Sequence, residues 1–185
     1  MGFNIFLAPL KYAPQEFGEL LVGDAAGGVG FEAAKLSHLG VNAKAARCNL
    51  ETADVRYRED GGAPTAASGI PRAITDEMWI CGQQALNQFR AIRAAAAAAL
   101  AGLSQAAACV VTWIGHGLHD GDQVSLRGIT QADWAALNGT HVITRLGADT
   151  FSIAVDTSEF AEVYAPETDP GQILALAKIS YTLYF

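Results

Sequence analysis

Four short apolar segments follow one another at roughly ten-residue spacing in the second half of the chain, and they constrain the fold more than any other feature. They are CVVTWI (109–114), QVSLRG (123–128), HVITRL (141–146) and TFSIAV (150–155). Turns rich in glycine and aspartate, such as HGLHDGD (116–122), separate them. Short strands at this spacing predict a small β-barrel or β-sandwich.

Period-two patterns elsewhere predict further strands. Side chains alternate from Arg47 to Tyr57, which favours one strand before the turn EDGG (59–62). Residues 18–31 are predicted to form short strands with turns, and 79–82 and 89–92 two more strands joined through 83–88. The last eleven residues, 175–185, alternate at their end and predict a closing strand that must pair with another.

An alanine-rich run, residues 93–108, separates the two sets of strands. Alanine favours helix, but a short helix made largely of alanine buries little surface and is marginal by itself. We therefore predict a linker or a short helix there. Residues 91–111, whose apolar content is mostly alanine, contribute too little transfer free energy for a membrane span, so we expect no membrane insertion.

The charge balance excludes one class of protein. Charged residues make up 17% of the chain and the formal net charge is −7. Nucleic-acid binding rests on many lysine and arginine contacts to phosphate, so we expect no nucleic-acid partner. So few charges are typical of a protein that covers much of its surface with neighbouring subunits.

The N-terminal residues lack the basic start and long apolar run of a signal peptide.

The residues that could carry chemistry have simpler interpretations. His116, His119, Asp120 and Asp122 lie within one turn that lacks the helix needed to aim two imidazoles at one ion, so we expect no metal site. The segment GDAAGGVG (23–30) lacks the Lys-Ser/Thr of a phosphate loop, so we interpret it as turned chain and expect no cofactor.

Three cysteines show no CxxC spacing and predict neither a disulfide framework nor a zinc ribbon. Cys48 and Cys109 lie in apolar strand patterns, and we interpret the cysteines, Cys81 included, as core thiols rather than nucleophiles. No GxSxG motif is present, and we predict no catalytic residue. Trp113 and Trp134 are interpreted as core and barrel-mouth residues rather than a ligand platform.

A charged strand end offers the one candidate contact site: Arg56, Arg58, Glu59 and Asp60. Two interpretations stay open. It is either a solvated hairpin tip or a contact to a neighbouring subunit, where arginine is favoured over lysine.

Two stretches resemble domains of phage proteins. HGL, GDQV, LRG, LNGT and TFSI, within 109–158, resemble a small β-domain of phage tail and fibre proteins whose fold is named for the first catalytic cysteine half-domain of ubiquitin-activating enzymes. That half-domain supplies no nucleophile, so no catalytic role carries over to Cys109. Outside it, CNLETADVRYREDG (48–61), PTAASG (64–69), FRAIR (89–93) and ISYTLYF (179–185) resemble a small domain of phage virion proteins.

In the virion pattern the closing strand follows FRAIR almost directly, whereas here residues 94–178 intervene. The resemblance therefore implies an all-β protein of two small β-barrel or β-sandwich domains, the second inserted before the last strand of the first. The expected divisions are a first domain of 1–93 plus 168–185, an alanine-rich linker of 94–108, an inserted barrel of 109–160 and a return linker of 161–167.

The resemblance implies a non-enzymatic structural protein of a bacteriophage particle. Within that class, the size and two-domain compactness of the chain favour a capsid-decorating or minor capsid protein. The alternative is a tail-associated adaptor or a receptor- or carbohydrate-binding module. The expected partners are major capsid or tail proteins of the same virion and further copies of the chain, with a homotrimer preferred. The expected location is the virion, assembled in the cytoplasm of the bacterial host.

Overall fold

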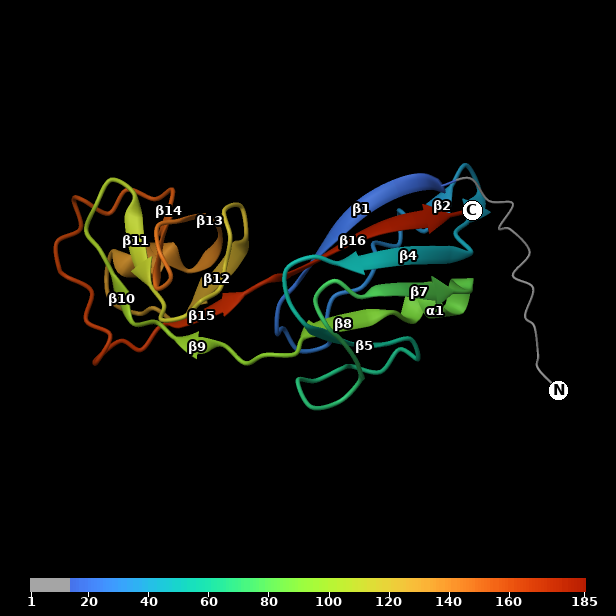
Figure 1. The fold of residues 1–185 in the computed structure, drawn as a ribbon, viewed down its shortest axis with the longest axis horizontal. Helices are drawn as coiled ribbons and strands as arrows, with labels where there is room; N and C mark the ends of the chain where they lie inside the picture. The colour runs from blue at the N-terminus through green and yellow to red at the C-terminus, as the bar shows by residue number, and fades with distance from the viewer. Residues whose placement is uncertain (1–13) are drawn as a thin grey trace.

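The protein is all-β and forms two units joined by two short connections (Figure 1). The computed structural model describes residues 14–185, so residues 1–13 of the predicted first domain, and most of the segment inspected for a signal peptide, lie outside the described residues. The first unit comprises residues 14–93 and 177–185, and the second comprises residues 98–175. The chain thus leaves the first unit and returns to it for its last strand.

Two antiparallel sheets make up most of the first unit. The larger has the order β1 (Pro14–Val22), β16 (Ala177–Tyr184), β4 (Ala45–Leu50) and β7 (Glu77–Cys81). The smaller has the order β6 (Ile70–Arg72), β5 (Val55–Arg58) and β8 (Arg90–Arg93). A hairpin of β2 (Ser37–His38) and β3 (Val41–Asn42) and the helix α1 (Gln83–Gln88) complete the unit.

The core of the first unit lies between these two sheets. Every second residue of β16 is buried, including Ile179, Tyr181 and Leu183, which is the alternation expected of a half-buried strand. Phe89 is fully buried between the sheets, and its ring lies 5.0 Å from that of Phe31. Apolar burial between two sheet faces therefore stabilises this unit.

The structure differs from the prediction at one strand and at one connection of the first unit. The single strand predicted over 47–57 is wrong, because β4 ends at Leu50 and β5 begins at Val55, in the other sheet. The corner between them uses polar side chains to satisfy backbone groups; Asp54 Oδ1, for example, accepts the Ile74 N–H at 2.8 Å. The predicted connection 83–88 is the helix α1.

The second unit is one curled antiparallel sheet. Its order is β10 (Gly102–Leu103), β11 (Cys109–Thr112), β14 (Thr150–Ile153), β13 (Gly139–Arg145), β12 (Gln123–Arg127), β15 (Gln172–Ala175) and β9 (Ala98–Ala99). A short 3-10 helix, η1 (Trp134–Leu137), lies before β13. The sheet encloses a separate apolar core that includes Trp134, Phe151 and Ile143.

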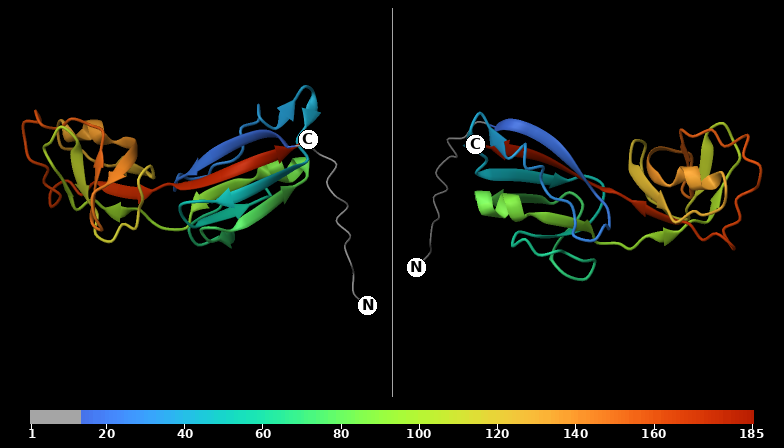
Figure 2. Two further views of the ribbon diagram at one scale, coloured as in Figure 1. Left: turned by 45° about the horizontal axis from the view of Figure 1, so that its top comes forward. Right: turned by 180° about the vertical axis from the view of Figure 1, so that it is seen from behind.

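The predicted linkers are partly wrong. Within 94–108 the strands β9 and β10 join the second sheet, because Leu100 and Leu103 supply the large apolar side chains that the alanines lack. Residues 168–175, predicted in the first domain, contribute β15 to the second sheet. The connections between the units shrink to residues 94–97 and Leu176, and Figure 2 shows β15 and β16 running from one unit into the other.

Candidate functional site

The predicted contact residues lie at the end of β5 and in the following turn. Arg56 and Arg58 are half-buried on the outer side of β5, where Arg56 Nη1 donates to the Gly69 carbonyl at 3.2 Å. Arg58 Nε donates to Asp60 Oδ1 at 2.9 Å, and the same oxygen accepts the Gly62 N–H. The Arg58 guanidinium holds the pKa of the Asp60 carboxyl well below its usual range. These bonds organise the turn, and a subunit contact through Glu59 and its neighbours stays a prediction.

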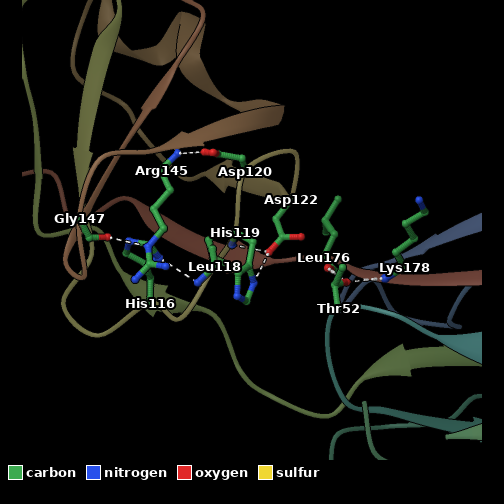
Figure 3. A network of polar contacts seen from close by, with 10 residues as sticks. All are labelled: Thr52, His116, Leu118, His119, Asp120, Asp122, Arg145, Gly147, Leu176 and Lys178. Atoms are coloured by element: carbon green, nitrogen blue, oxygen red, sulfur yellow. Dashed lines mark hydrogen bonds and ion pairs between the residues drawn. The ribbon is translucent and has the colours of Figure 1, made fainter. Parts of the chain in front are cut away.

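The His116–Asp122 segment uses its side chains to close a turn (Figure 3). His116 Nδ1 accepts the Leu118 N–H at 3.0 Å, and Asp122 accepts the His119 N–H at 2.8 Å. Asp120 accepts the Arg145 N–H from β13. Within residues 14–185 no group of three histidine, cysteine or acidic side chains is arranged to hold a metal ion.

Two of the three cysteines are core residues, as predicted. Cys48 and Cys109 are fully buried, and burial raises the pKa of the Cys48 thiol to about 12. Burial also raises the pKa of Cys109. A thiol with a raised pKa holds little thiolate at neutral pH and is a poor nucleophile. Cys81 is exposed at the end of β7, so its interpretation as a core thiol is wrong.

The glycine-rich segment 23–30 packs against β8. Val29 exchanges two backbone hydrogen bonds with Ala91, each of 2.8 Å. A Cβ atom on Gly28 would lie 2.7 Å from the Ala91 carbonyl oxygen, and one on Gly30 would lie 2.5 Å from that of Phe89. The glycines therefore serve close backbone approach rather than phosphate binding.

The two tryptophans of the second unit lie in and against its core. Trp134 is fully buried, and its indole Nε1 donates to the Glu162 carbonyl at 2.8 Å. Trp113 is half-buried and packs against the same core. Since Trp134 offers no exposed ring, it provides no stacking platform for a sugar.

Leu176 forms the junction between the units. Its N–H donates to the Gln123 carbonyl in the second unit at 2.9 Å, while its carbonyl accepts the Thr52 hydroxyl of the first unit at 3.1 Å. The Thr52 hydroxyl oxygen also accepts the Lys178 N–H at 2.9 Å (Figure 3). Beside this junction, Arg127 makes a two-point ion pair with Asp24, with Nη2 2.6 Å from Oδ2.

A polar cleft of about 330 Å³ lies beside this junction. Lys178 Nζ stands 2.7 Å from Glu19 and 3.2 Å from Glu51 on the side of the first unit. Asp120 and Asp122 line the opposite side. Hydrogen bonds from Ser180 and Lys178 lower the pKa of Glu51, and the two glutamates raise that of Lys178. The cation and its two carboxylates thus satisfy one another.

The outer face of the four-stranded sheet presents rows of side chains to solvent. The rows are Phe17–Thr182–Arg47–Trp79, Glu19–Ser180–Asn49–Glu77 and Leu21–Lys178–Glu51. Phe17 is 70% exposed, Trp79 is 40% exposed and Leu21 is 38% exposed. This surface was not predicted from the sequence, although the alternation of Phe17, Glu19 and Leu21 is a signal for it.

The comparisons with known proteins add no relative. No family model and no curated protein matches this chain. In the part of the chain that the structure describes, no helix is both long and apolar enough to cross a membrane.

Proposed function

We propose that this chain is a non-enzymatic structural protein of a bacteriophage particle, a capsid-decorating or minor capsid protein. It associates through its β surfaces with copies of itself and with the major capsid or tail proteins of the same virion. One unit anchors to the lattice and the other projects from it. The assembly takes place in the cytoplasm of the bacterial host.

The placement of the segments that resemble phage virion proteins carries this proposal. CNLETADVRYREDG contains the end of β4 and all of β5, FRAIR contains β8, and ISYTLYF lies in β16 and the residue after it. Although residues 94–178 separate the last two, β16 pairs with β4 in one sheet and packs over β5 and β8 in one core. Segments that meet in one sandwich are consistent with one domain type interrupted by another.

The outer sheet face supports the same proposal. It combines exposed apolar side chains, Phe17, Leu21 and Trp79, with paired charges such as Arg47 and Glu77. Exposed aromatic groups among satisfied polar groups are typical of protein–protein contact surfaces.

Immunogold labelling of purified particles from the source phage tests the proposal. The antibody is raised against the recombinant protein, and the control is the same antibody absorbed with that protein. Gold over the head is the expected result. Gold at the tail would replace capsid decoration by the tail-adaptor alternative. Unlabelled particles whose mass spectrum lacks the protein would overturn the virion proposal.

A further inference from the structure

Most sheet edges of this protein are short or covered, and the edge strand β1 is the exception. The edges of the second sheet, β9 and β10, have two residues each. In the three-stranded sheet β6 has three residues, and β8 is covered by the segment around Val29. β7 has five residues, whereas β1 has nine. Natural proteins keep exposed edges short, charged or covered, because unpaired backbone groups attract further strands.

The features that protect an edge are limited in β1 to its two glutamates, Glu16 and Glu19, and to its start, where Pro14 precedes an irregularity. Within residues 14–185 it pairs on one side only, with β16, and it lies along the rim of the first unit (Figure 1). It contains no lysine, and near its centre Phe17 is 70% exposed. Its irregularity is confined to the first residues, between Pro14 and Glu16. A long edge of this kind is suited to the addition of another strand.

We propose that β1 pairs antiparallel with β1 of a second copy about a twofold axis at Gly18. Two four-stranded sheets would then join into one sheet of eight strands. The inference rests on the proposed function, because it supplies the contact between copies that an assembly protein needs. It replaces the threefold expectation, since identical antiparallel edges pair through a twofold axis.

The sequence of β1 selects both the partner and the register. Directly opposed residues of an antiparallel pair point to the same face, so the axis must pass through a residue and not between two. An axis at Glu19 would oppose two carboxylates, which destabilises a pair. An axis at Gly18 pairs the regular part of β1, with Glu16 opposite Leu20, and places Phe17 opposite Glu19 of the second copy.

This register also accounts for the exposed aromatic ring. The two Phe17 side chains would be diagonal neighbours on the outer face, within reach of one another. The row Phe17–Thr182–Arg47–Trp79 of one copy would continue into the row Glu19–Ser180–Asn49–Glu77 of the other. At the axis, a Cβ atom on Gly18 would lie 2.3 Å from the Tyr181 hydroxyl oxygen, so a larger residue there would require the buried Tyr181 side chain to shift.

Sedimentation of the full chain tests the pairing. Wild type is expected to form a dimer as its concentration is raised to about 100 μM. Sedimentation over that range detects a dissociation constant in the micromolar range. Phe17→Glu opposes Glu19 twice in each dimer and should weaken association at least about tenfold. Val163→Glu, at a side chain 71% exposed in the second unit, is the matched control and should leave the dimer intact.

A charge swap makes the test specific for the register. Phe17→Glu combined with Glu19→Lys opposes unlike charges at both positions and should restore the dimer. Far-UV circular dichroism establishes that each variant is folded. A monomeric or trimeric wild type, or a Phe17→Glu variant that dimerises like wild type, would overturn the proposal.

Crosslinking distinguishes a second copy from other occupants of the edge. In a Cys81→Ser background, Phe17→Cys with Glu19→Cys places opposed thiols across the axis, and oxidation should yield a covalent dimer. Leu21→Cys alone, with no opposed thiol, should remain monomeric on a denaturing gel. An uncrosslinked Phe17→Cys/Glu19→Cys variant would indicate that residues 1–13 or another protein cover β1. Gold on virions together with such a result would retain the proposed function and reject the pairing.

Discussion

The two units of this protein are stabilised by different kinds of contact. In the first, strands of up to nine residues bring two apolar faces together around Phe89 and Ile179. In the second, the longest strand, β13, has seven residues, and long loops enclose the core. Buried polar side chains hold those loops in place through hydrogen bonds. The fully buried Thr157 hydroxyl donates to the Ser104 and Ala106 carbonyls, and the Asp169 carboxylate, in a residue that is 6% exposed, accepts from Thr130 and Gln131.

The difference follows from where backbone polar groups find partners. Long strands pair most of their backbone groups within the sheet, so side-chain hydrogen bonds in the first unit are needed chiefly at corners, as from Arg93 to the Asp54 carbonyl. Short strands leave more backbone in loops, and buried groups there require side-chain partners. The first unit should therefore be sensitive to lost apolar volume, and the second also to lost hydrogen bonds.

The largest expected effect is on the apolar core of either unit. Ile179→Ala removes a fully buried side chain from β16 and should lower the stability of the first unit by about 2–5 kcal/mol. The matched variant Ile153→Ala should lower that of the second unit instead. Hydrogen exchange with mass spectrometry reports each unit separately. Equal loss of protection in both units from either variant would show that the two cores unfold as one.

A smaller loss is expected at Asp169. Its carboxylate accepts the Thr130 N–H, the Thr130 hydroxyl and the Gln131 N–H at 2.8–3.0 Å. Asp169→Ala leaves these donors without a partner and should lower the stability of the second unit by about 1–3 kcal/mol. Glu167→Ala, at an exposed position in the same loop, is the control for urea unfolding. Equal urea midpoints of unfolding for the two variants would show that the second unit does not depend on the hydrogen bonds of Asp169.

The same carboxylate predicts a dependence on pH. The hydrogen bond from the Gln131 N–H, followed by those from Thr130, lowers the pKa of Asp169 below its ordinary value of 3.8. A carboxyl group whose pKa is lowered by folding stabilises the folded state at pH values above its ordinary pKa. This stabilisation is lost as the pH falls through the pKa of the folded state. The difference in the free energy of unfolding between wild type and Asp169→Asn, measured with urea, should therefore become smaller from about pH 5 downward. A difference that does not change with pH would contradict a lowered pKa of Asp169 in the folded state.

The smallest effect is expected at the junction. Thr52→Val removes the hydroxyl that bonds to both Leu176 and Lys178 and should cost about 1 kcal/mol of local stability. Thr52→Ser keeps the hydroxyl and is the control. Small-angle scattering should detect a wider range of orientations between the units for the valine variant only. Unchanged scattering would assign the orientation to the Asp24–Arg127 ion pair instead.

Several features of the site were accessible from the sequence because they depend on local chemistry. Aspartate and glycine at 116–122 predicted a turn, and the side chains there do close one. Apolar strand patterns predicted that Cys48 and Cys109 are buried. The rows of the outer sheet face were not accessible, because they join residues from β1, β16, β4 and β7 that are distant in the chain.

The sequence by itself determined the all-β class and most of the longer strands, because period-two burial leaves a readable pattern in four or more residues. Only the tertiary structure decided which sheet the short segments join. β9 and β15 are two and four residues long, and they pair with each other and, in the case of β15, with β12, partners that lie far along the chain. The corner at 51–54 was decided in the same way, since burial on both sides of the sandwich overrides a continuous alternation.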